Sequence, residues 1–178
     1  MATRKTKLLD HDALANYALR VLGGRAYSAG ELKEKLRQRA ERSQDVDAVL
    51  AKLKESGYLD DKRFAENYAS ARLENQGFGK MRVLRDLRQH RVAPNLALQV
   101  TERTFQSTDE TDLIEAFLKR KFRGKQLGTF LADQKNLAAA FRRLRYAGFA
   151  SDTSIRVLKR YASQAEVLES LEPEEPEN

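Results

Sequence analysis

The sequence predicts an all-α protein, an elongated, curved array of three tandem three-helix repeats. Apolar residues recur at the three- and four-residue spacing of amphipathic helices between positions 12 and 162. No alternating apolar run is flanked by the turn residues of a β-hairpin. Two segments also occur twice in the sequence. Residues 78–90 are similar to residues 27–39, and residues 141–152 are similar to residues 50–61. Repetition at such a period is typical of stacked helical units that cannot bury their apolar faces alone.

Local signals indicate where several helices begin and end. Ser28 and Glu31 have the S-x-x-E spacing of a capping box, which predicts a helix that begins directly after Ser28. In the second copy of this segment Gly79 replaces the capping serine. Gly57 and Gly148 each follow an apolar stripe and suit the left-handed residue that ends a helix.

Further local signals predict the boundaries of other helices. Gly23-Gly24 is expected to stop the first helix, Asp60 to cap the fourth, and Pro94 to lie in the first turn of the sixth. The last repeat is expected to contain an extra turn or short helix. The predicted domains are a flexible N-terminus (1–11), three repeats (12–57, 58–105 and 109–162) and an acidic, disordered tail (163–178).

Composition limits where the protein works. The chain has no cysteine, which excludes a disulfide framework and thiolate metal sites and suits a reducing cytosol. The N-terminal residues contain no apolar run of signal-peptide length, and no segment has the roughly 20 apolar residues needed to span a membrane. We therefore expect a soluble, cytoplasmic protein without membrane contact. No dimerisation heptad is evident, so we expect a monomer.

The charge is distributed unevenly along the chain. The formal net charge is +7, but all six charged residues from Gln164 onward are glutamates. The preceding residues hold all 33 basic side chains and only 20 of the 26 acidic ones, which gives them a net charge of +13. A body this basic favours a polyanion or an acidic protein surface as its partner. The tail could compete with DNA for the basic surface, although we favour a simply solvated end.

Signals of catalysis are nearly absent. His11 and His90 lie far apart without ligand-spaced partners, so solvated or capping roles are the preferred interpretation. Residues 124–129 contain the letters of a phosphate-binding loop in the wrong order. Asp60-Asp61 is better explained as an N-cap followed by a first-turn charge than as an acid–base pair. We predict no enzyme activity, no catalytic residue, no metal site and no cofactor.

Clusters of basic residues carry the functional signal. Arg82, Arg85 and Arg88 recur every third residue, opposite an apolar stripe, and are expected to project together into solvent. Two further clusters follow, and the three together are our candidate contacts with a filament or a nucleic acid: Arg82, Arg85, Arg88; Lys119, Arg120, Lys121, Arg123, Lys125; and Arg142, Arg143, Arg145. Arginine dominates them, and its planar guanidinium suits phosphates and carboxylates. Such contacts predict salt-dependent, sequence-indifferent binding.

Several short motifs follow one another in an order that is difficult to obtain by chance. They are Gly57-Tyr58-Leu59-Asp60-Asp61-x-Arg63-Phe64-Ala65, Ser70-x-Arg72, Gly77-Phe78-Gly79, Arg82-Val83-x-x-x-Leu87, Arg120-Lys121-Phe122 and Arg145-Tyr146-Ala147-Gly148-Phe149. The succession resembles the RecX regulatory protein family from about Leu14 to Tyr161, most specifically over residues 57–92. The chain departs from the family's pattern where Lys80 replaces a common proline and His90-Arg91-Val92 replaces the usual Lys-Gly-Ile. The lost glycine puts the exit from the fifth helix in question.

The resemblance implies a bacterial regulator of the RecA recombinase. Members of the family lodge in the groove of the RecA–single-stranded DNA filament and limit its extension, ATPase, strand exchange and coprotease activities. It therefore implies a role in DNA repair, recombination and the SOS response, with direct DNA binding at most weak. Two alternatives remain open from the residues alone. One is a stand-alone helical DNA-binding protein or transcription factor, and the other is a helical scaffold for another acidic protein.

Overall fold

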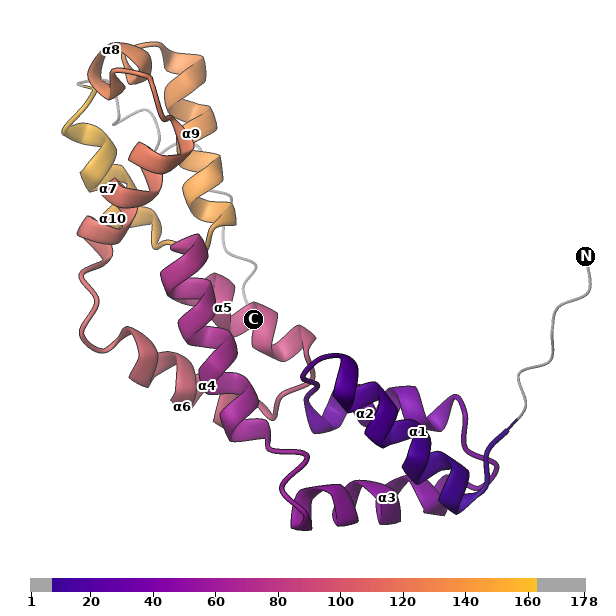
Figure 1. Cartoon of the computed structure of the whole chain (residues 1–178). Coiled ribbons are helices and arrows are strands. Elements are labelled where there is room, and N and C mark those ends of the chain that lie inside the picture. The colour runs from indigo at the N-terminus through magenta and orange to yellow at the C-terminus, as the bar shows by residue number, and fades with distance from the viewer. Residues whose placement is uncertain (1–7, 163–178) are drawn as a thin grey trace, which may run out of the picture. The chain divides into compact units, whose positions relative to one another are not determined.

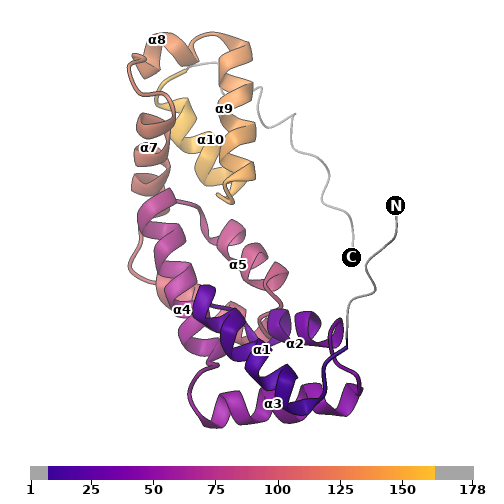
Figure 2. The same cartoon turned by 45° about the vertical axis from the view of Figure 1, so that its right-hand side comes forward.

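The computed structural model describes residues 8–162, in which all regular secondary structure is helical (Figures 1 and 2). The helices are α1 (His11–Gly24), α2 (Ala29–Arg37), α3 (Ser43–Glu55), α4 (Asp61–Ala71), a π-turn η1 (Arg72–Gln76), α5 (Lys80–Gln89), α6 (Pro94–Phe105), α7 (Glu110–Lys121), α8 (Leu127–Leu131), α9 (Gln134–Tyr146) and α10 (Ser151–Lys159). The predicted all-α class is confirmed. The predicted acidic tail lies outside the described residues.

The described chain divides into two compact units. Unit 1 comprises residues 8–68 and 86–100, and unit 2 comprises residues 69–85 and 101–162. Both units draw residues from the predicted second repeat, 58–105. The division into three repeats therefore stays a prediction.

Each unit has its own apolar core. In unit 1, buried side chains of α1, α2 and α3, such as Leu14, Leu32 and Val46, pack together. In unit 2, buried side chains of α7, α9 and α10, such as Ile114 and Leu144, form the second cluster, which α8 joins. Each fully buried leucine or isoleucine of these clusters contributes roughly 1.5–3 kcal/mol to stability.

The predicted helix ends are confirmed at the positions with the strongest signals. Ser28 and Glu31 form a complete capping box at the start of α2, with Ser28 Oγ accepting the Glu31 amide at 3.0 Å. Asp60 caps α4 by accepting the Arg63 amide at 2.9 Å. Pro94 is the first residue of α6. The extra element expected in the last repeat is α8.

The predicted N-terminal segment, 1–11, is described only from residue 8. Leu9 forms an isolated bridge with Ala40, in which its amide donates to the carbonyl of Arg39 at 2.7 Å. Asp10 then caps α1 by accepting the amide of Ala13 at 3.0 Å. The residues directly before α1 are therefore tied to unit 1.

The repeated segment 27–39 begins a helix that docks on a left-handed turn. At the start of α2, the Ser28 hydroxyl donates to the carbonyl of His90, just beyond the end of α5. An added Cβ at Gly30 would lie 2.5 Å from the Cβ and carbonyl oxygen of Arg91. Arg91 itself has φ +57°, although it is not glycine. The exit from α5 thus keeps the left-handed conformation without the glycine that usually allows it.

The start of the second copy, residues 78–85, repeats this docking in unit 2. The amide of Gly79 donates to the carbonyl of Ala147 at 2.8 Å, and the amide of Met81 donates to that of Gly148 at 3.2 Å. Gly148 has φ +87°, as predicted for a residue that ends a helix. A Cβ at position 79 or 148 would collide with the opposing backbone, so both glycines are required where α5 meets α9.

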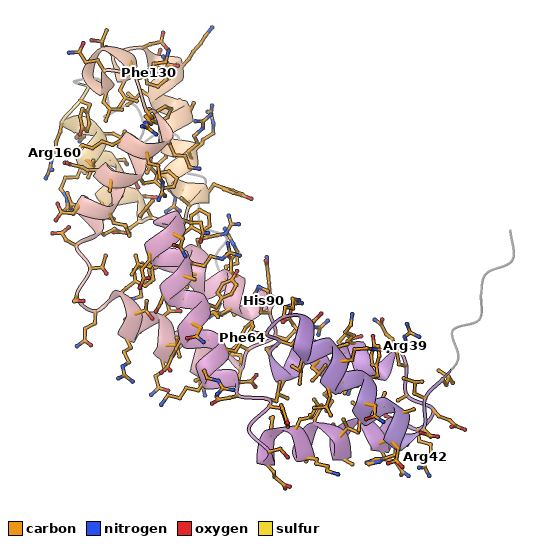
Figure 3. All side chains as sticks on the ribbon, in the orientation of Figure 1. Arg39, Arg42, Phe64, His90, Phe130 and Arg160 are labelled. Carbon is orange, nitrogen blue, oxygen red and sulfur yellow. The ribbon has the colours of Figure 1, made fainter. Side chains whose placement is uncertain are left out.

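His90 lies in unit 1, where the start of α2, α4 and the end of α5 meet, a contact that we call the joint of unit 1 (Figure 3). Its expected solvated or capping role is wrong. Its Nδ1 lies 3.0 Å from Glu31 Oε1, and its ring packs edge-on against Tyr68 at 4.7 Å and Phe64 at 5.6 Å. Burial alone raises the pKa of the Glu31 carboxyl, but hydrogen bonds from Arg25 and His90 outweigh it, so the pKa lies below its usual value. Asp61 adds to the joint by accepting the amide of Ala29 at 2.6 Å.

Candidate functional site

The candidate site of unit 2 is built on α9, a helix with sharply divided faces. Asp133 caps its first turn by accepting the amide of Asn136 at 2.9 Å. Leu137, Phe141 and Leu144 face the core. The opposite face exposes Arg142, Arg143, Arg145 and Tyr146, and α9 contains no acidic residue. Because these arginines lie in the last two turns, the helix dipole favours their positive charge.

Two arginines of α5 reach the end of α9. Arg82 Nη1 and Arg85 Nη2 both donate to the carbonyl of Tyr146, at 3.3 and 3.4 Å. Their guanidinium carbons lie 4.6 and 6.0 Å from the centre of the Tyr146 ring. Two of the three predicted clusters therefore meet at Tyr146.

The expectation that Arg82, Arg85 and Arg88 project together into solvent is wrong for Arg82. That side chain is only half exposed, since it also lies over the Phe78 ring at 5.1 Å. Arg85 and Arg88 are exposed as expected. Arg88 belongs to unit 1, and its side chain makes no hydrogen bond or ion pair with the described residues.

The third predicted cluster spans the last turn of α7 and the residues after it, and it contacts α9 through an aromatic ring. Its five cations, Lys119, Arg120, Lys121, Arg123 and Lys125, are all exposed. Arg143 of α9 lies 5.3 Å from the ring of Phe122, at the end of α7. The 119–125 and 142–145 clusters are therefore neighbours, although about 20 residues separate them in sequence.

Some of these cationic side chains bond to other parts of the fold, and others have no such bond. Arg120 Nη1 donates to the carbonyl of Asn75 at 3.4 Å, which ties α7 to η1. Lys119 approaches Glu115 at 3.8 Å, and Arg145 donates to the carbonyl of Phe149 at 3.1 Å. By contrast, three side chains make no hydrogen bond, ion pair or cation–π contact with any described residue: Arg123, Lys125 and Arg142. These three cations are available to an incoming anion.

We call the set Arg82, Arg85, Lys119, Arg120, Lys121, Arg123, Lys125, Arg142, Arg143, Arg145 and Tyr146 the arginine surface of unit 2. Guanidinium groups bind phosphate or carboxylate oxygens through paired N–H donors. Cations at the end of a helix without acidic residues give a local positive potential that attracts polyanions. The arrangement can therefore bind a phosphate backbone or an acidic protein surface.

Sequence reasoning missed the aromatic members of this surface. The sequence places Phe122 among the cations of residues 119–125, but it shows Tyr146 and Phe78 only within the motifs of the family resemblance. The available signal was Tyr146 itself, four residues after Arg142 on the polar stripe of an amphipathic helix. An aromatic ring at such a position is not accounted for by the core.

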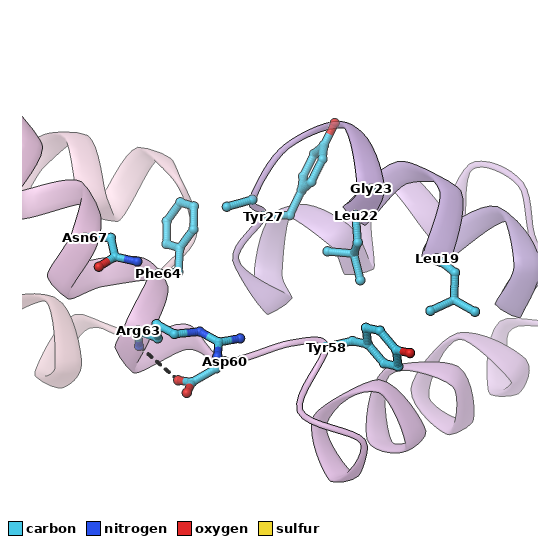
Figure 4. A pocket seen from close by; sticks show the side chains of 10 residues that line it. Leu19, Leu22, Gly23, Tyr27, Tyr58, Asp60, Arg63, Phe64 and Asn67 are labelled. Atoms are coloured by element: carbon cyan, nitrogen blue, oxygen red, sulfur yellow. Dashed lines mark hydrogen bonds between the residues drawn. The ribbon is translucent and has the colours of Figure 1, made fainter.

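Two grooves of the described chain contain carboxylates that already take part in bonds of the fold. One in unit 1, of about 350 Å³, lies between α1 and the start of α4 and is lined by Leu22, Tyr27 and Phe64 (Figure 4). Its only carboxylate, Asp60, is already used as the cap of α4. A second, of about 450 Å³ in unit 2, contains Glu102, paired with Lys80 at 2.6 Å, and Glu110, which accepts the amide of Ala150 at 3.0 Å.

Within residues 8–162, no three side chains of the metal-binding types come close enough together to hold a metal ion. No helix among these residues is long and apolar enough to cross a bilayer.

The fold and this surface define an all-helical protein with an arginine-rich surface. Comparison with known proteins gives the family. Residues 16–53 match the family model for the first three-helix domain of RecX, and residues 60–100 match that for the second. The chain is 30% identical over 135 residues to regulatory protein RecX of Trichlorobacter lovleyi, covering 76% of this chain and 86% of the relative. It is 31% identical over 146 residues to regulatory protein RecX of Legionella pneumophila, covering 82% and 93%.

The chain therefore belongs to the RecX family of regulatory proteins. Solved structures agree on the fold. The crystal structure of RecX from Lactobacillus salivarius superposes with a TM-score of 0.62 at 17% identity, covering 85% of this chain and 96% of that one. Another crystal structure of regulatory protein RecX gives a TM-score of 0.66 at 17% identity, covering 83% and 72%. The predicted family and its helical repeats are confirmed.

Proposed function

We propose that this protein binds the filament that the RecA recombinase forms on single-stranded DNA and lowers its activity, without itself catalysing a reaction. The affected activities would be ATP hydrolysis, filament extension, strand exchange and coprotease action. The cell compartment implied is the cytoplasm, where the filament forms. Membership of the RecX family supports a regulatory role, and the arginine surface of unit 2 supports a polyanionic or acidic partner.

The observation that carries the proposal is the convergence of separate cationic clusters around α9. Arg82 and Arg85 come from a helix about 60 residues earlier, yet both bond to the carbonyl of Tyr146. Arg143 reaches the 119–125 cluster through Phe122. A filament presents repeated phosphates and acidic side chains, and binding to such an array gains from several cations held together.

The mechanism we propose is obstruction of the filament. A protein lodged across neighbouring recombinase subunits would oppose the nucleotide-driven rearrangement of those subunits and the addition of the next one. A regulator of this kind acts at ratios well below one per recombinase monomer, since each bound molecule affects several subunits.

The cleanest test removes the cations that the fold does not use. A triple variant carrying Arg123→Glu, Lys125→Glu and Arg142→Glu reverses three side chains without described partners, so its fold should be unchanged. We expect the concentration needed to inhibit the recombinase ATPase to rise at least ten-fold. The matched control, with Lys52→Glu, Lys54→Glu and Lys62→Glu, changes the same charge on exposed residues of unit 1. Equal loss in both variants, or none in the first, would exclude this surface.

A further inference from the structure

The Tyr146 ring is the most exposed large apolar side chain of the described chain, with a relative exposure of 69%. It contributes nothing to the buried cluster of unit 2. The structural bonds at this position are made by its carbonyl, which any residue could supply to Arg82 and Arg85. Apart from its cation–π contacts with Arg82 and Arg85, the ring makes no contact in the described fold that accounts for an exposed aromatic side chain here.

The surroundings of the ring are cationic on several sides. The guanidinium groups of Arg82 and Arg85 lie 4.6 and 6.0 Å from the ring centre. Arg142 stands one helical turn before Tyr146, on the same side of α9, and its side chain has no partner among the described residues. An exposed ring thus has the Arg82 guanidinium over one face, with Arg85 and Arg142, which can also bind phosphate, near it.

We propose that Tyr146 is a stacking platform for one unpaired base of a single-stranded nucleic acid, with Arg82, Arg85 and Arg142 holding the adjoining phosphates. Sites of this kind combine an aromatic face, which any base can cover, with cations that follow the backbone. A duplex offers its bases already paired and stacked, so the platform selects single strands. The inference rests on the proposed function and names the component of the filament that this surface meets, namely the DNA strand.

The other exposed tyrosine of the described chain provides an internal control. Tyr58 has a relative exposure of 62%, yet no arginine or lysine lies over its ring among the described contacts. It also belongs to unit 1. Substitution of Tyr58 therefore removes a similarly exposed ring that lacks the surrounding cations.

The experiment measures binding of the full chain to a fluorescently labelled oligothymidylate by anisotropy, at several salt concentrations. We expect Tyr146→Leu to weaken binding by about five-fold to a hundred-fold, the range for loss of one stacked base. The salt dependence should stay unchanged, because no cation is removed. Tyr146→Phe should bind like the unmodified chain, and so should Tyr58→Leu.

An abasic strand of the same length separates stacking from phosphate binding. Tyr146→Leu should not weaken binding to it, because there is no base to stack. Equal loss on the abasic and normal strands, or no loss on either, would overturn the inference. So would a chain that inhibits the recombinase through Tyr146 while failing to bind the oligonucleotide, since the ring would then contact protein. A chain that binds the oligonucleotide through Tyr146 but leaves the recombinase unaffected would instead refute the proposed function and keep the platform.

Discussion

The substitution Gly148→Ala tests the contact between α5 and α9, because Gly148 combines a left-handed backbone with a close approach to Arg82. Its φ is +87°, and an added Cβ would collide with the amide nitrogen and the Cα and Cβ atoms of Arg82. The left-handed conformation costs a non-glycine residue about 1–2 kcal/mol. Forcing an extra methyl against backbone adds about 1–3 kcal/mol. We therefore expect Gly148→Ala to destabilise unit 2 by roughly 2–5 kcal/mol.

Unit 2 offers three other glycines that separate these two effects. Gly124 has φ +80° but open space where a Cβ would lie, so Gly124→Ala should cost only the conformational part, about 1–2 kcal/mol. Gly79 lacks a positive φ but faces the backbone of Gly148, so Gly79→Ala should cost only the collision, about 1–3 kcal/mol. Gly128 has neither feature, so Gly128→Ala should leave stability unchanged or raise it slightly.

The assay is thermal and urea unfolding of the full chain, followed by circular dichroism. For a chain of this length 1 kcal/mol moves Tm by about 2–4 °C, so Gly148→Ala should lower the Tm of unit 2 by about 4–20 °C. The two units need not unfold together, so a transition that splits in this variant would assign the loss to unit 2. If Gly148→Ala costs no more than Gly124→Ala, the close approach of α5 to α9 is not as described.

Three further predictions concern the joint in unit 1. The pKa of Glu31 is lowered in the folded protein, so its ionised form stabilises the fold above about pH 4.5. This contribution is lost as the pH falls through the folded-state pKa. Glu31→Gln should therefore reduce the loss of stability that urea unfolding measures between pH 7 and 3.5. Arg91→Gly should raise stability by up to about 1 kcal/mol by relieving a left-handed arginine, and lower stability in thermal unfolding would contradict this. Ser28→Ala should cost about 1–2 kcal/mol in the same assay, because it removes both the cap of α2 and the bond to His90, whereas Ser43→Ala, at a helix start without a side-chain cap, should cost less.

The helix ends were predictable because their causes are local. The capping box of Ser28 and Glu31 needs only residues three positions apart, and Pro94 fixes its own backbone angle. The left-handed glycines at 57 and 148 follow from the same reasoning. Each of these signals acts within one helical turn, so the tertiary structure has little power to override it.

The features that escaped prediction depend on contacts between distant parts of the chain. Arg91 takes a glycine-like conformation where α2 docks on the end of α5, which nothing in its own neighbourhood indicates. The π-turn after α4 is likewise invisible in the apolar spacing. His90 acquires its role from Glu31 and Tyr68, at sequence separations of 59 and 22 residues.

The basic residues of the arginine surface could be picked out from the sequence, but their arrangement relative to one another could not. The spacing of Arg82, Arg85 and Arg88 indicated one solvated stripe, which is correct for an isolated helix. The end of α9 lies against α5, however, so Arg82 packs on Phe78 and Tyr146. Tyr146 was missed because an exposed aromatic ring matters only once its neighbours are known.

The most direct test of the central proposal is the single-stranded-DNA-dependent ATPase of the cognate RecA recombinase, titrated with this protein well below one molecule per recombinase monomer. We predict strong inhibition at those ratios, without displacement of the recombinase from DNA, and its weakening by the Arg123/Lys125/Arg142 charge reversal. Inhibition that begins only when the protein saturates the DNA would contradict the proposal, since it would mark a general basic nucleic-acid binder that competes for bare strand.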